Sequence, residues 1–510
     1  MTKKSSDYGN KDQGLNLDVS RRGFLKGTVA AAVTVGSAEV LTGCANEIYD
    51  YIVVGAGPGG APLAANLAKE GYRVALVEAG MDPKGEDAAL IDPNVSVIYE
   101  TPGLFPATSE HPLLSWDFFV NHYENEEQQK KDSKYVDGKG ILYPRGSCLG
   151  GSSSHNALVF IYPHDSDFDF ISDVTGDSSW NAQDMREYFV RVENCAYCEV
   201  GSDGHGFNGY MPTSVVEPSV YELFPTIKDF STVGGTLPGS YYEGNTSLDI
   251  NHPLVAQGDT GMFVAPMHVE NNKRVTVRDY LIETRDLYPE NLTIITNALV
   301  TKVIMSEGSA VGVEYLESGG VNYTANKLHD SSDSDVVRSI YAKNEVILSG
   351  GTFNTPQLLM LSGIGPAKEL MSHGIDVVCD LPGVGANLQD RYEVSLAVDL
   401  KENLELFARC RPFQEGDPCL ASYLSGEWET EDEFPAPYHG PYASNVIFAT
   451  RIAKSSVAKE MPDLFLIGLP APFTGYYPGH SQKASANRWT WLVLKAHNEN
   501  TAGKVKLRSA

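Results

Sequence analysis

A strand pattern that opens directly into a glycine-rich turn constrains this chain most. Residues 49–54 form a largely apolar, β-branched run, and Gly55, Gly57 and Gly60 follow it at the spacing GxGxxG. In such a unit the first glycine tightens the turn, the second lets backbone approach a pyrophosphate, and the third lets the next helix pack on the strand. The phosphates would lie at the positive N-terminus of that helix. The pattern predicts a Rossmann-like unit for an ADP-containing cofactor.

A carboxylate after the next strand narrows the choice of cofactor. Residues 73–77 read as a second strand that ends at Glu78, 23 residues beyond Gly55. Glu78 can accept both ribose hydroxyls of an adenosine, and it disfavours the 2′-phosphate of NADP. Residues 291–315 and 345–361 also read as strands followed by a glycine turn or helix. We therefore expect an α/β protein that binds FAD or NAD.

The amino-acid composition limits the classes of protein to which this chain can belong. The 510 residues are 42% apolar and 21% charged, which is typical of a globular chain of two or three domains. The 66 acidic and 39 basic residues give a formal net charge of -27. Such a charge repels phosphates, so we exclude nucleic acid as a partner.

The first 44 residues have the pattern of an export signal. Residues 20–26 read SRRGFLK, a twin-arginine motif, and the apolar run after them is too short to span a bilayer. Residues 41–44 read LTGC, like a bacterial lipobox, in which Cys44 is acylated. We expect residues 1–44 to be a signal peptide that places a lipoprotein on the periplasmic face of a bacterial membrane. The alternative is a twin-arginine peptide with a chance cysteine.

Six cysteines remain after Cys44, and the sequence does not resolve their pairing. Cys195 and Cys198 form a CxxC without a thioredoxin-like context or a second CxxC for zinc. We expect a local disulfide or two buried thiols there, with no metal bound. The polar run at residues 329–335 is typical of a surface loop.

Two long motifs decide between FAD and NAD. Residues 143–156 read YPRGSCLGGSSSHN, and residues 350–366 read GGTFNTPQLLMLSGIGP. In this order they resemble the two signatures of the glucose-methanol-choline (GMC) oxidoreductase family, and the resemblance runs over residues 49–510. It implies a GMC fold that binds FAD and oxidises the CH–OH group of a small alcohol, with hydride passing to flavin N5.

The resemblance also assigns residues to the flavin. Gly150 and Gly151 would let backbone meet the isoalloxazine edge, Asn156 would hydrogen-bond near it, and Val300 would lie on the adenine side. The predicted cofactor-binding residues are Gly55, Gly57, Gly60, Glu78, Arg145, Gly150, Gly151, Ser152, His155, Asn156, Ala157 and Val300.

The sequence around His155 supports a more specific hypothesis about how the flavin is held. Residues 153–156 read SSHN, which is similar to the flavin loop of choline oxidase and its relatives. In those proteins the histidine is bonded covalently to the flavin 8α carbon. His155 therefore implies either a covalent flavin or an ordinary hydrogen-bonding histidine.

The catalytic base has no candidate in this sequence. The family uses a histidine, paired with a second histidine or an asparagine, well downstream of a segment similar to residues 503–510. We therefore expect the catalytic histidine to lie beyond Ala510, and the sequence reads as C-terminally truncated, with residues 505–509 as a half-buried strand. His439, His480 and His497 lack the family's context, so we nominate none of them as the base.

These observations predict two domains. Residues 45–172 and 206–390 would form the FAD-binding domain, and residues 173–205 and 391–510 an α+β substrate domain. We expect an FAD-dependent oxidoreductase; the alternatives are a catalytically dead FAD-binding fragment and a flavin-binding lyase on the same fold. A lipid anchor would make a quinone or cytochrome a plausible electron acceptor, with oxygen as the alternative.

Overall fold

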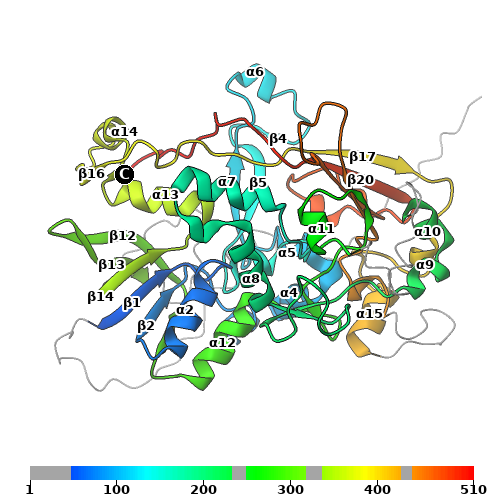
Figure 1. The fold of residues 1–510 in the computed structure, drawn as a ribbon, viewed down its shortest axis with the longest axis horizontal. Coiled ribbons are helices and arrows are strands. Elements are labelled where there is room, and N and C mark those ends of the chain that lie inside the picture. The colour runs from blue at the N-terminus through cyan, green and yellow to red at the C-terminus, as the bar shows by residue number, and fades with distance from the viewer. Residues whose placement is uncertain (1–46, 232–248, 318–335, 427–438) are drawn as a thin grey trace, which may run out of the picture.

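The computed structural model describes residues 47–231, 249–317, 336–426 and 439–510 (Figure 1). The predicted signal peptide with Cys44 and the predicted loop at residues 329–335 lie outside the described residues. Among the described residues, no helix combines the length and the apolar character needed to cross a membrane.

A six-stranded sheet contains the predicted glycine-turn unit. Its order is β11 (Leu292–Ile295), β2 (Val74–Val77), β1 (Ile48–Val54), β14 (Val336–Leu348), β13 (Ser309–Glu317) and β12 (Ala298–Ser306). The first four strands are parallel, and β13 and β12 extend the sheet in antiparallel register. The mixed α/β class and the strands predicted at residues 49–54 and 73–77 are confirmed.

Two helices cover one face of this sheet beside β1 (Figure 1). In α2 (Gly60–Lys69) the small side chains Ala61, Ala64 and Ala68 are completely buried, so the helix lies close to the strand below it. The second helix, α12 (Val277–Leu287), packs Val277 and Leu281 into the same cluster. Small apolar residues at helical spacing thus set the close helix–sheet packing that the glycine turn requires.

A second, antiparallel sheet lies apart from the first (Figure 1). Its order is β17 (Glu393–Asp399), β20 (Arg488–Lys495), β19 (Leu464–Leu469), β18 (Ala449–Ala453) and β8 (Gly261–Phe263). Four of these strands come from the range predicted to form the substrate domain. β8 comes from the range predicted for the FAD-binding domain, yet it pairs with β18. The division into two domains stays a prediction.

The other elements connect and cover the two sheets. Further helices are α3 (Glu86–Ile91), α4 (Val95–Glu100), α5 (Phe105–Thr108), α6 (Glu126–Gln129), α7 (Asp165–Thr175), α8 (Ala182–Val192), α9 (Ser219–Leu223), α10 (Pro225–Ser231), α11 (Pro253–Ala256), α13 (Gly351–Leu361), α14 (Ala367–Ser372) and α15 (Pro418–Ser425). Further strands are β3 (Ser115–Val120), β4 (Tyr135–Val136), β5 (Gly140–Gly146), β6 (Glu193–Cys195), β7 (Met211–Thr213), β9 (Val269–Glu270), β10 (Lys273–Arg274), β15 (Ile364–Gly365) and β16 (Cys379–Asp380).

The strand predicted at residues 505–509 is wrong. This segment has no regular strand; its bonds are single contacts, from the Val505 N–H to the Gly385 carbonyl (2.8 Å) and from the Leu507 N–H to the Glu369 carboxylate (3.0 Å). The last residues, up to Ala510, are exposed. The alternating pattern fails because the segment lies beside an irregular loop that offers no ladder of backbone partners.

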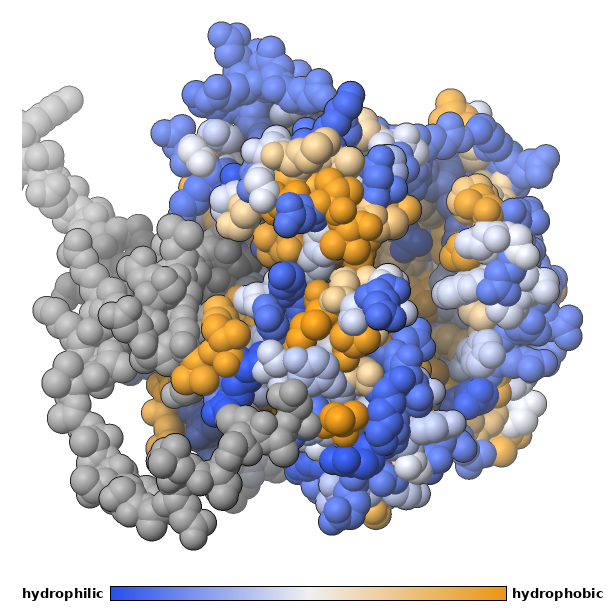
Figure 2. Space-filling view, turned by 90° about the vertical axis from the view of Figure 1, so that its left-hand side faces the viewer, coloured by the Kyte–Doolittle hydropathy of each residue, from blue (hydrophilic) through white to orange (hydrophobic). Residues whose placement is uncertain are grey.

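The end of the molecule with α14, β16 and β12 to β14 shows apolar patches separated by hydrophilic residues (Figure 2). Exposed apolar side chains in or next to these elements include Met371 of α14, Val378 just before β16 and Val337 of β14. The apolar surface at this end is therefore broken up by polar residues.

A buried charged triad and a disulfide hold the segment that joins α8 to β7. His205 Nδ1 lies 3.0 Å from Glu193 Oε2, and His205 Nε2 lies 2.6 Å from Asp249 Oδ2. Cys195 and Cys198 form a disulfide beside them, which is one of the two predicted states. Burial alone would lower the pKa of His205, but the hydrogen bonds to Asp249 and Glu193 outweigh it and raise the pKa to about 9.

We expect this triad to make stability fall at alkaline pH. The unfolded imidazole titrates near its ordinary pKa of about 6.5, so the protonated triad stabilises the fold fully below that pH. Its contribution is lost as the pH rises through about 9. Thermal unfolding of wild type and His205→Gln from pH 6 to pH 10 tests this: the difference in melting temperature should shrink across that range. A difference that stays constant would contradict the assignment.

Candidate functional site

Backbone geometry at the end of β1 explains the first and third glycines of the predicted turn. Gly55 has a φ of +101°, and a Cβ there would lie 2.4 Å from the Ser349 carbonyl oxygen. A Cβ on Gly60 would lie 2.0 Å from the Gly55 carbonyl oxygen. Neither position accepts a side chain while the turn keeps its shape.

Gly57 differs from these two glycines, because the protein itself leaves room beside it. A Cβ on Gly57 would meet only Gly151 Cα, at an ordinary contact distance of 3.8 Å. The N–H groups of Gly60 and Ala61 both donate to the Gly57 carbonyl, at 3.1 and 3.0 Å. These two hydrogen bonds form the first turn of α2. No side chain caps the helix start. A glycine with free space at an uncapped helix N-terminus fits a phosphate that approaches the backbone.

The loop at residues 150–157 contacts the glycine turn at residues 55–60. The Gly150 N–H donates to the Ala56 carbonyl (3.0 Å), and a Cβ on Gly151 would lie 2.5 Å from Gly57 Cα. Gly151 also has a φ of +52°. Residues far apart in the sequence are therefore brought into backbone contact, as the FAD-binding expectation requires.

Glu78 lies at the carboxyl end of β2 and is buried. Its two carboxylate oxygens accept hydrogen bonds from the backbone N–H groups of Ala56 (2.8 Å) and Gly80 (2.9 Å). Burial raises the pKa of Glu78, and the backbone hydrogen bonds oppose that rise. Each oxygen keeps a further lone pair, so the predicted role toward ribose hydroxyls fits this geometry. The Ala298 N–H donates to the Glu78 carbonyl (3.0 Å), which brings Val300 on β12 to the same edge.

A buried arginine that sequence reasoning missed fixes the loop at residues 150–157. Arg274 donates to the carbonyls of Tyr99 (3.1 Å), Ser153 (3.0 Å) and Asn156 (3.0 Å), and to Asn156 Oδ1 (3.0 Å). Burial lowers the pKa of Arg274 to about 10. His268 Nε2 also lies 3.0 Å from Asn156 Oδ1. These contacts set the position and orientation of Asn156.

His155 is buried, and its Nε2 has no hydrogen-bond partner. Burial, with Arg145 and then Arg274, lowers the pKa of His155 to about 3, so the imidazole is neutral at pH 7. Arg145 donates to the Pro144 carbonyl (2.8 Å) and lies 4.1 Å from the centre of the Tyr143 ring. A buried ring nitrogen without a partner is rare in native proteins and calls for an explanation.

The structure thus brings half of the predicted cofactor residues into one region. Gly55, Gly57, Gly60, Glu78, Gly150 and Gly151 form one contiguous backbone region through the contacts above. Ser152 is exposed, and the Ala157 carbonyl accepts a hydrogen bond from Asn445 of the segment before β18 (2.7 Å). Arg274, His268 and Asn445 carried no sequence motif; only their burial around the loop identifies them.

Nothing in the described residues tests the expectation of a catalytic histidine, so that role stays a prediction. Two of the late histidines that the sequence left without a role have local contacts. His497 Nε2 lies 3.0 Å from Asp167 Oδ1 at the start of α7. His480 Nε2 lies 3.2 Å from the Ser109 hydroxyl. These contacts tie the two histidines to α7 and to the segment after α5.

Comparison with known proteins identifies relatives over most of the chain. A family model described as GMC oxidoreductase matches residues 49–393. An alcohol dehydrogenase [acceptor] of Pseudomonas putida is 30% identical over 465 residues, which cover 91% of this chain and 72% of the relative. An oxygen-dependent choline dehydrogenase of Brucella anthropi is 26% identical over 466 residues, which cover 90% of this chain and 71% of the relative.

Solved structures with this fold include flavoenzymes. A formate oxidase of Aspergillus oryzae, studied for FAD modification, superposes with a TM-score of 0.68 at 18% identity, over 91% of this chain and 75% of that chain. A pyridoxine 4-oxidase superposes with a TM-score of 0.62 at 21% identity, over 88% of this chain and 72% of that chain. At these identities the likeness shows the fold.

Proposed function

The chain belongs to the GMC oxidoreductase family, and from this premise we propose that it is an FAD-dependent oxidoreductase that oxidises the CH–OH group of a small alcohol. The observation that carries the proposal is the meeting of Gly57 and Gly151 at the start of α2, with space left beside Gly57. The relatives named as alcohol and choline dehydrogenases support the type of substrate.

The residues of the two loops fit the parts of FAD. Gly57 and the positive N-terminal end of α2 would hold the pyrophosphate, and Glu78 would accept ribose hydroxyls. Val300 would line the adenine side. Arg145, Gly150, Ser152, Asn156 and Ala157 would surround the flavin end, where Arg274 keeps the loop in one conformation.

FAD, when bound, supplies the hydride acceptor of the reaction. The protein contributes position and electrostatics. The buried Arg274 guanidinium places positive charge beside Asn156 and His155, and the hydrogen bonds described above join it to neutral carbonyl and amide oxygens. That charge favours negative charge that develops near the loop during oxidation. The residue that takes the hydroxyl proton is not assigned among the described residues.

We further propose that His155 attaches the flavin covalently. Its Nε2 is unpartnered and the ring is neutral at pH 7. A bond from Nε2 to the flavin 8α carbon would replace a C–H bond of that carbon, with the C–H and N–H protons released and the C–H electron pair passed to the flavin ring. Acid precipitation should leave the yellow colour in the wild-type pellet and move all of it to the supernatant for His155→Ala. Complete release from the wild type would rule out the bond. Dialysis before the acid step checks that the variant still holds FAD.

Anaerobic reduction tests the oxidation itself. Purified holoprotein mixed with a panel of small alcohols in the absence of oxygen should lose its flavin absorbance near 450 nm with at least one of them. Dithionite, a chemical reductant, serves as the positive control for a reducible flavin. A flavin that dithionite bleaches and no alcohol reduces would contradict the proposal and favour a lyase or an inactive protein.

Location and electron acceptor remain proposals drawn from residues outside the described ranges. We propose twin-arginine export, acylation of Cys44 and a place on the periplasmic face of the membrane, where a quinone or cytochrome would accept the electrons. Palmitate labelling of wild type and its absence in Cys44→Ala test the anchor. Robust peroxide formation by the purified protein would overturn the quinone or cytochrome assignment.

A further inference from the structure

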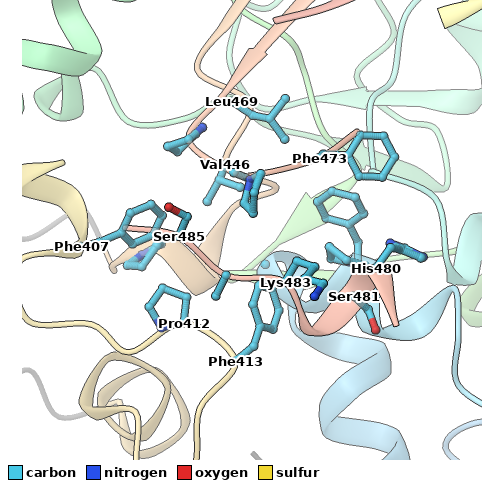
Figure 3. Close-up of a pocket in the computed structure, with 18 of the residues that line it drawn as sticks. Phe407, Pro412, Phe413, Val446, Leu469, Phe473, His480, Ser481, Lys483 and Ser485 are labelled. Atoms are coloured by element: carbon cyan, nitrogen blue, oxygen red, sulfur yellow. The ribbon is translucent and has the colours of Figure 1, made fainter. Parts of the chain in front are cut away.

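A partly open pocket lies beside the second sheet (Figure 3). Its volume is about 70 Å³. One water molecule needs about 10–15 Å³ of such space, so the pocket has room for a group of several carbon atoms. Phenylalanine, proline and aliphatic side chains make up most of its walls, among them Phe407, Phe413, Val446, Leu469 and Phe473. Such walls suit an apolar group.

Two residues of the wall have a backbone conformation that their side chains disfavour. Val446 has a φ of +51° and Phe413 a φ of +59°. A β-branched or bulky residue rarely adopts this left-handed region, and it stays there only where neighbouring contacts hold it. Strain of this kind clusters at ligand-binding and active sites. The two residues lie on different sides of the pocket in the view of Figure 3, so the strain is present in both walls.

Contacts within the protein hold these two residues in place. The Val446 N–H donates to the Ser444 hydroxyl (3.2 Å). Phe413 lies in the loop that the disulfide Cys410–Cys419 closes, and its N–H donates to the Tyr442 hydroxyl (3.4 Å). These contacts fix both walls without a ligand, so the pocket is preformed.

Segments of the wall also contact the loop at residues 150–157. Asn445, directly before the wall residue at position 446, donates to the Ala157 carbonyl of that loop (2.7 Å). Gly103 of the wall follows Tyr99, whose carbonyl accepts a hydrogen bond (3.1 Å) from the buried arginine that fixes the loop. The pocket therefore adjoins the loop that is predicted to surround the flavin end of FAD.

The charge on the pocket wall is positive. Lys483 lines the pocket at an exposed position, and no aspartate or glutamate lines it among the described residues. A quaternary ammonium group loses water when it enters a pocket, and a carboxylate or aromatic faces must compensate for that loss. The rings of this pocket attract a cation, but Lys483 repels it. An uncharged group meets no such repulsion and has no ionic hydration to lose.

We propose that this pocket receives the uncharged, branched or aromatic end of the alcohol that the protein oxidises, and that it discriminates against quaternary ammonium alcohols. This inference rests on the proposed function and narrows the substrate class of that site. Val446 and Phe413 set the shape of the pocket, and Lys483 sets its preference of charge. The inference separates this chain from the relative named as a choline dehydrogenase.

Two alcohols of nearly the same shape test the proposal. 3,3-Dimethylbutan-1-ol carries a tert-butyl group where choline carries a trimethylammonium group. The purified full-length protein is kept anaerobic, with any bound flavin already reduced by dithionite, so that neither alcohol can be oxidised. NMR titration observed on the ligands should show 3,3-dimethylbutan-1-ol binding at least about ten-fold more tightly than choline. Choline binding equally or more tightly, or no binding of either alcohol, would overturn the proposal.

Lys483→Glu tests the preference of charge at an exposed position. It should shift the affinity ratio of the two alcohols toward choline by about three- to 30-fold, because the wall then attracts the cation. Lys368→Glu makes the same change of charge on an exposed residue of α14, outside the pocket, and should leave the ratio unchanged. An unchanged ratio in Lys483→Glu, or an equal shift in Lys368→Glu, would contradict the assignment.

Val446→Gly tests the wall itself. Glycine adopts the same φ without strain, so the backbone keeps its course while the wall loses an isopropyl group. The affinity for 3,3-dimethylbutan-1-ol should fall by about three- to ten-fold, because the tert-butyl group loses apolar contact. Thermal unfolding checks that the variant is folded. A folded variant that binds this alcohol as tightly as the wild type would show that the alcohol binds elsewhere.

The outcomes are distinct from those of the proposed oxidation. An alcohol that reduces the flavin, together with an unchanged ratio in Lys483→Glu, would refute the pocket assignment alone. Selective binding of 3,3-dimethylbutan-1-ol, together with a flavin that dithionite reduces and no alcohol reduces, would refute the oxidation and leave the binding site.

Discussion

Gly57→Ala is expected to weaken FAD binding strongly and to leave the stability of the apoprotein unchanged. The protein tolerates a Cβ at this position, since its nearest neighbour, Gly151 Cα, would lie 3.8 Å away. A bound pyrophosphate would occupy that space. Overpacking a close contact costs about 1–3 kcal/mol, which corresponds to roughly five- to 150-fold weaker binding. Fluorescence titration of apoprotein with FAD measures the affinity, and thermal unfolding without FAD measures stability.

Gly60→Ala is the matched control, because the same added methyl group has a different consequence there. Its Cβ would lie 2.0 Å from the Gly55 carbonyl oxygen, so the turn itself must move. This variant should lose stability even without FAD, by about 1–3 kcal/mol or more. If Gly57→Ala bound FAD as tightly as the wild type, the cofactor would not lie against Gly57.

Arg274→Met is expected to be among the most destabilising single changes in the protein. It removes the donor shared by the carbonyls of Tyr99, Ser153 and Asn156, which are left without that partner in a buried region. Loss of such a network costs about 2–5 kcal/mol of unfolding free energy. Denaturant unfolding measures the loss. FAD affinity should fall as well, because the loop at residues 150–157 loses its fixed conformation.

The neighbouring Lys273→Met separates this effect from a general loss of charge. Lys273 is exposed and pairs with Glu100 at 2.9 Å, and such surface pairs contribute about 0–1 kcal/mol. A similar small effect for Arg274→Met would show that the buried guanidinium does not hold the loop. The pKa values of His155 and His268, which Arg274 helps to lower, should also rise in any Arg274→Met protein that folds.

The turn around Gly55 was predictable because its constraints are local. The strand, the three glycines and the helix follow one another in the sequence. The Gly55 carbonyl constrains Gly60, and Ser349 after the neighbouring strand constrains Gly55, whereas Gly57 keeps free space beside it. Glu78 was predictable for the same reason, since it ends the next strand. The hydrogen bonds that Glu78 accepts from Ala56 and Gly80 could not be predicted, because they depend on how the ends of the two strands pack.

The contacts that support the loop at residues 150–157 could not be predicted from the sequence. Arg274 stands 118 positions from Asn156, and nothing in its neighbourhood distinguishes it from an exposed arginine. His480 was passed over because it lies in a proline-rich segment without a motif, yet tertiary packing buries it. The prediction of a strand at residues 505–509 was wrong for a different reason. The alternation of apolar and polar residues is present there, but no strand among the described residues lies beside it to pair with it.

Flavin content tests the central claim most directly. Purified wild-type protein should carry about one FAD molecule per chain. If the flavin stays bonded to His155, mass spectrometry of the digested protein identifies it; if acid releases the flavin, chromatography of the supernatant identifies it. Gly57→Ala, purified in parallel, should carry much less. The account would be contradicted by a folded wild-type protein that takes up no FAD when the cofactor is supplied. It would also be contradicted by a folded wild-type protein that binds NAD in place of FAD.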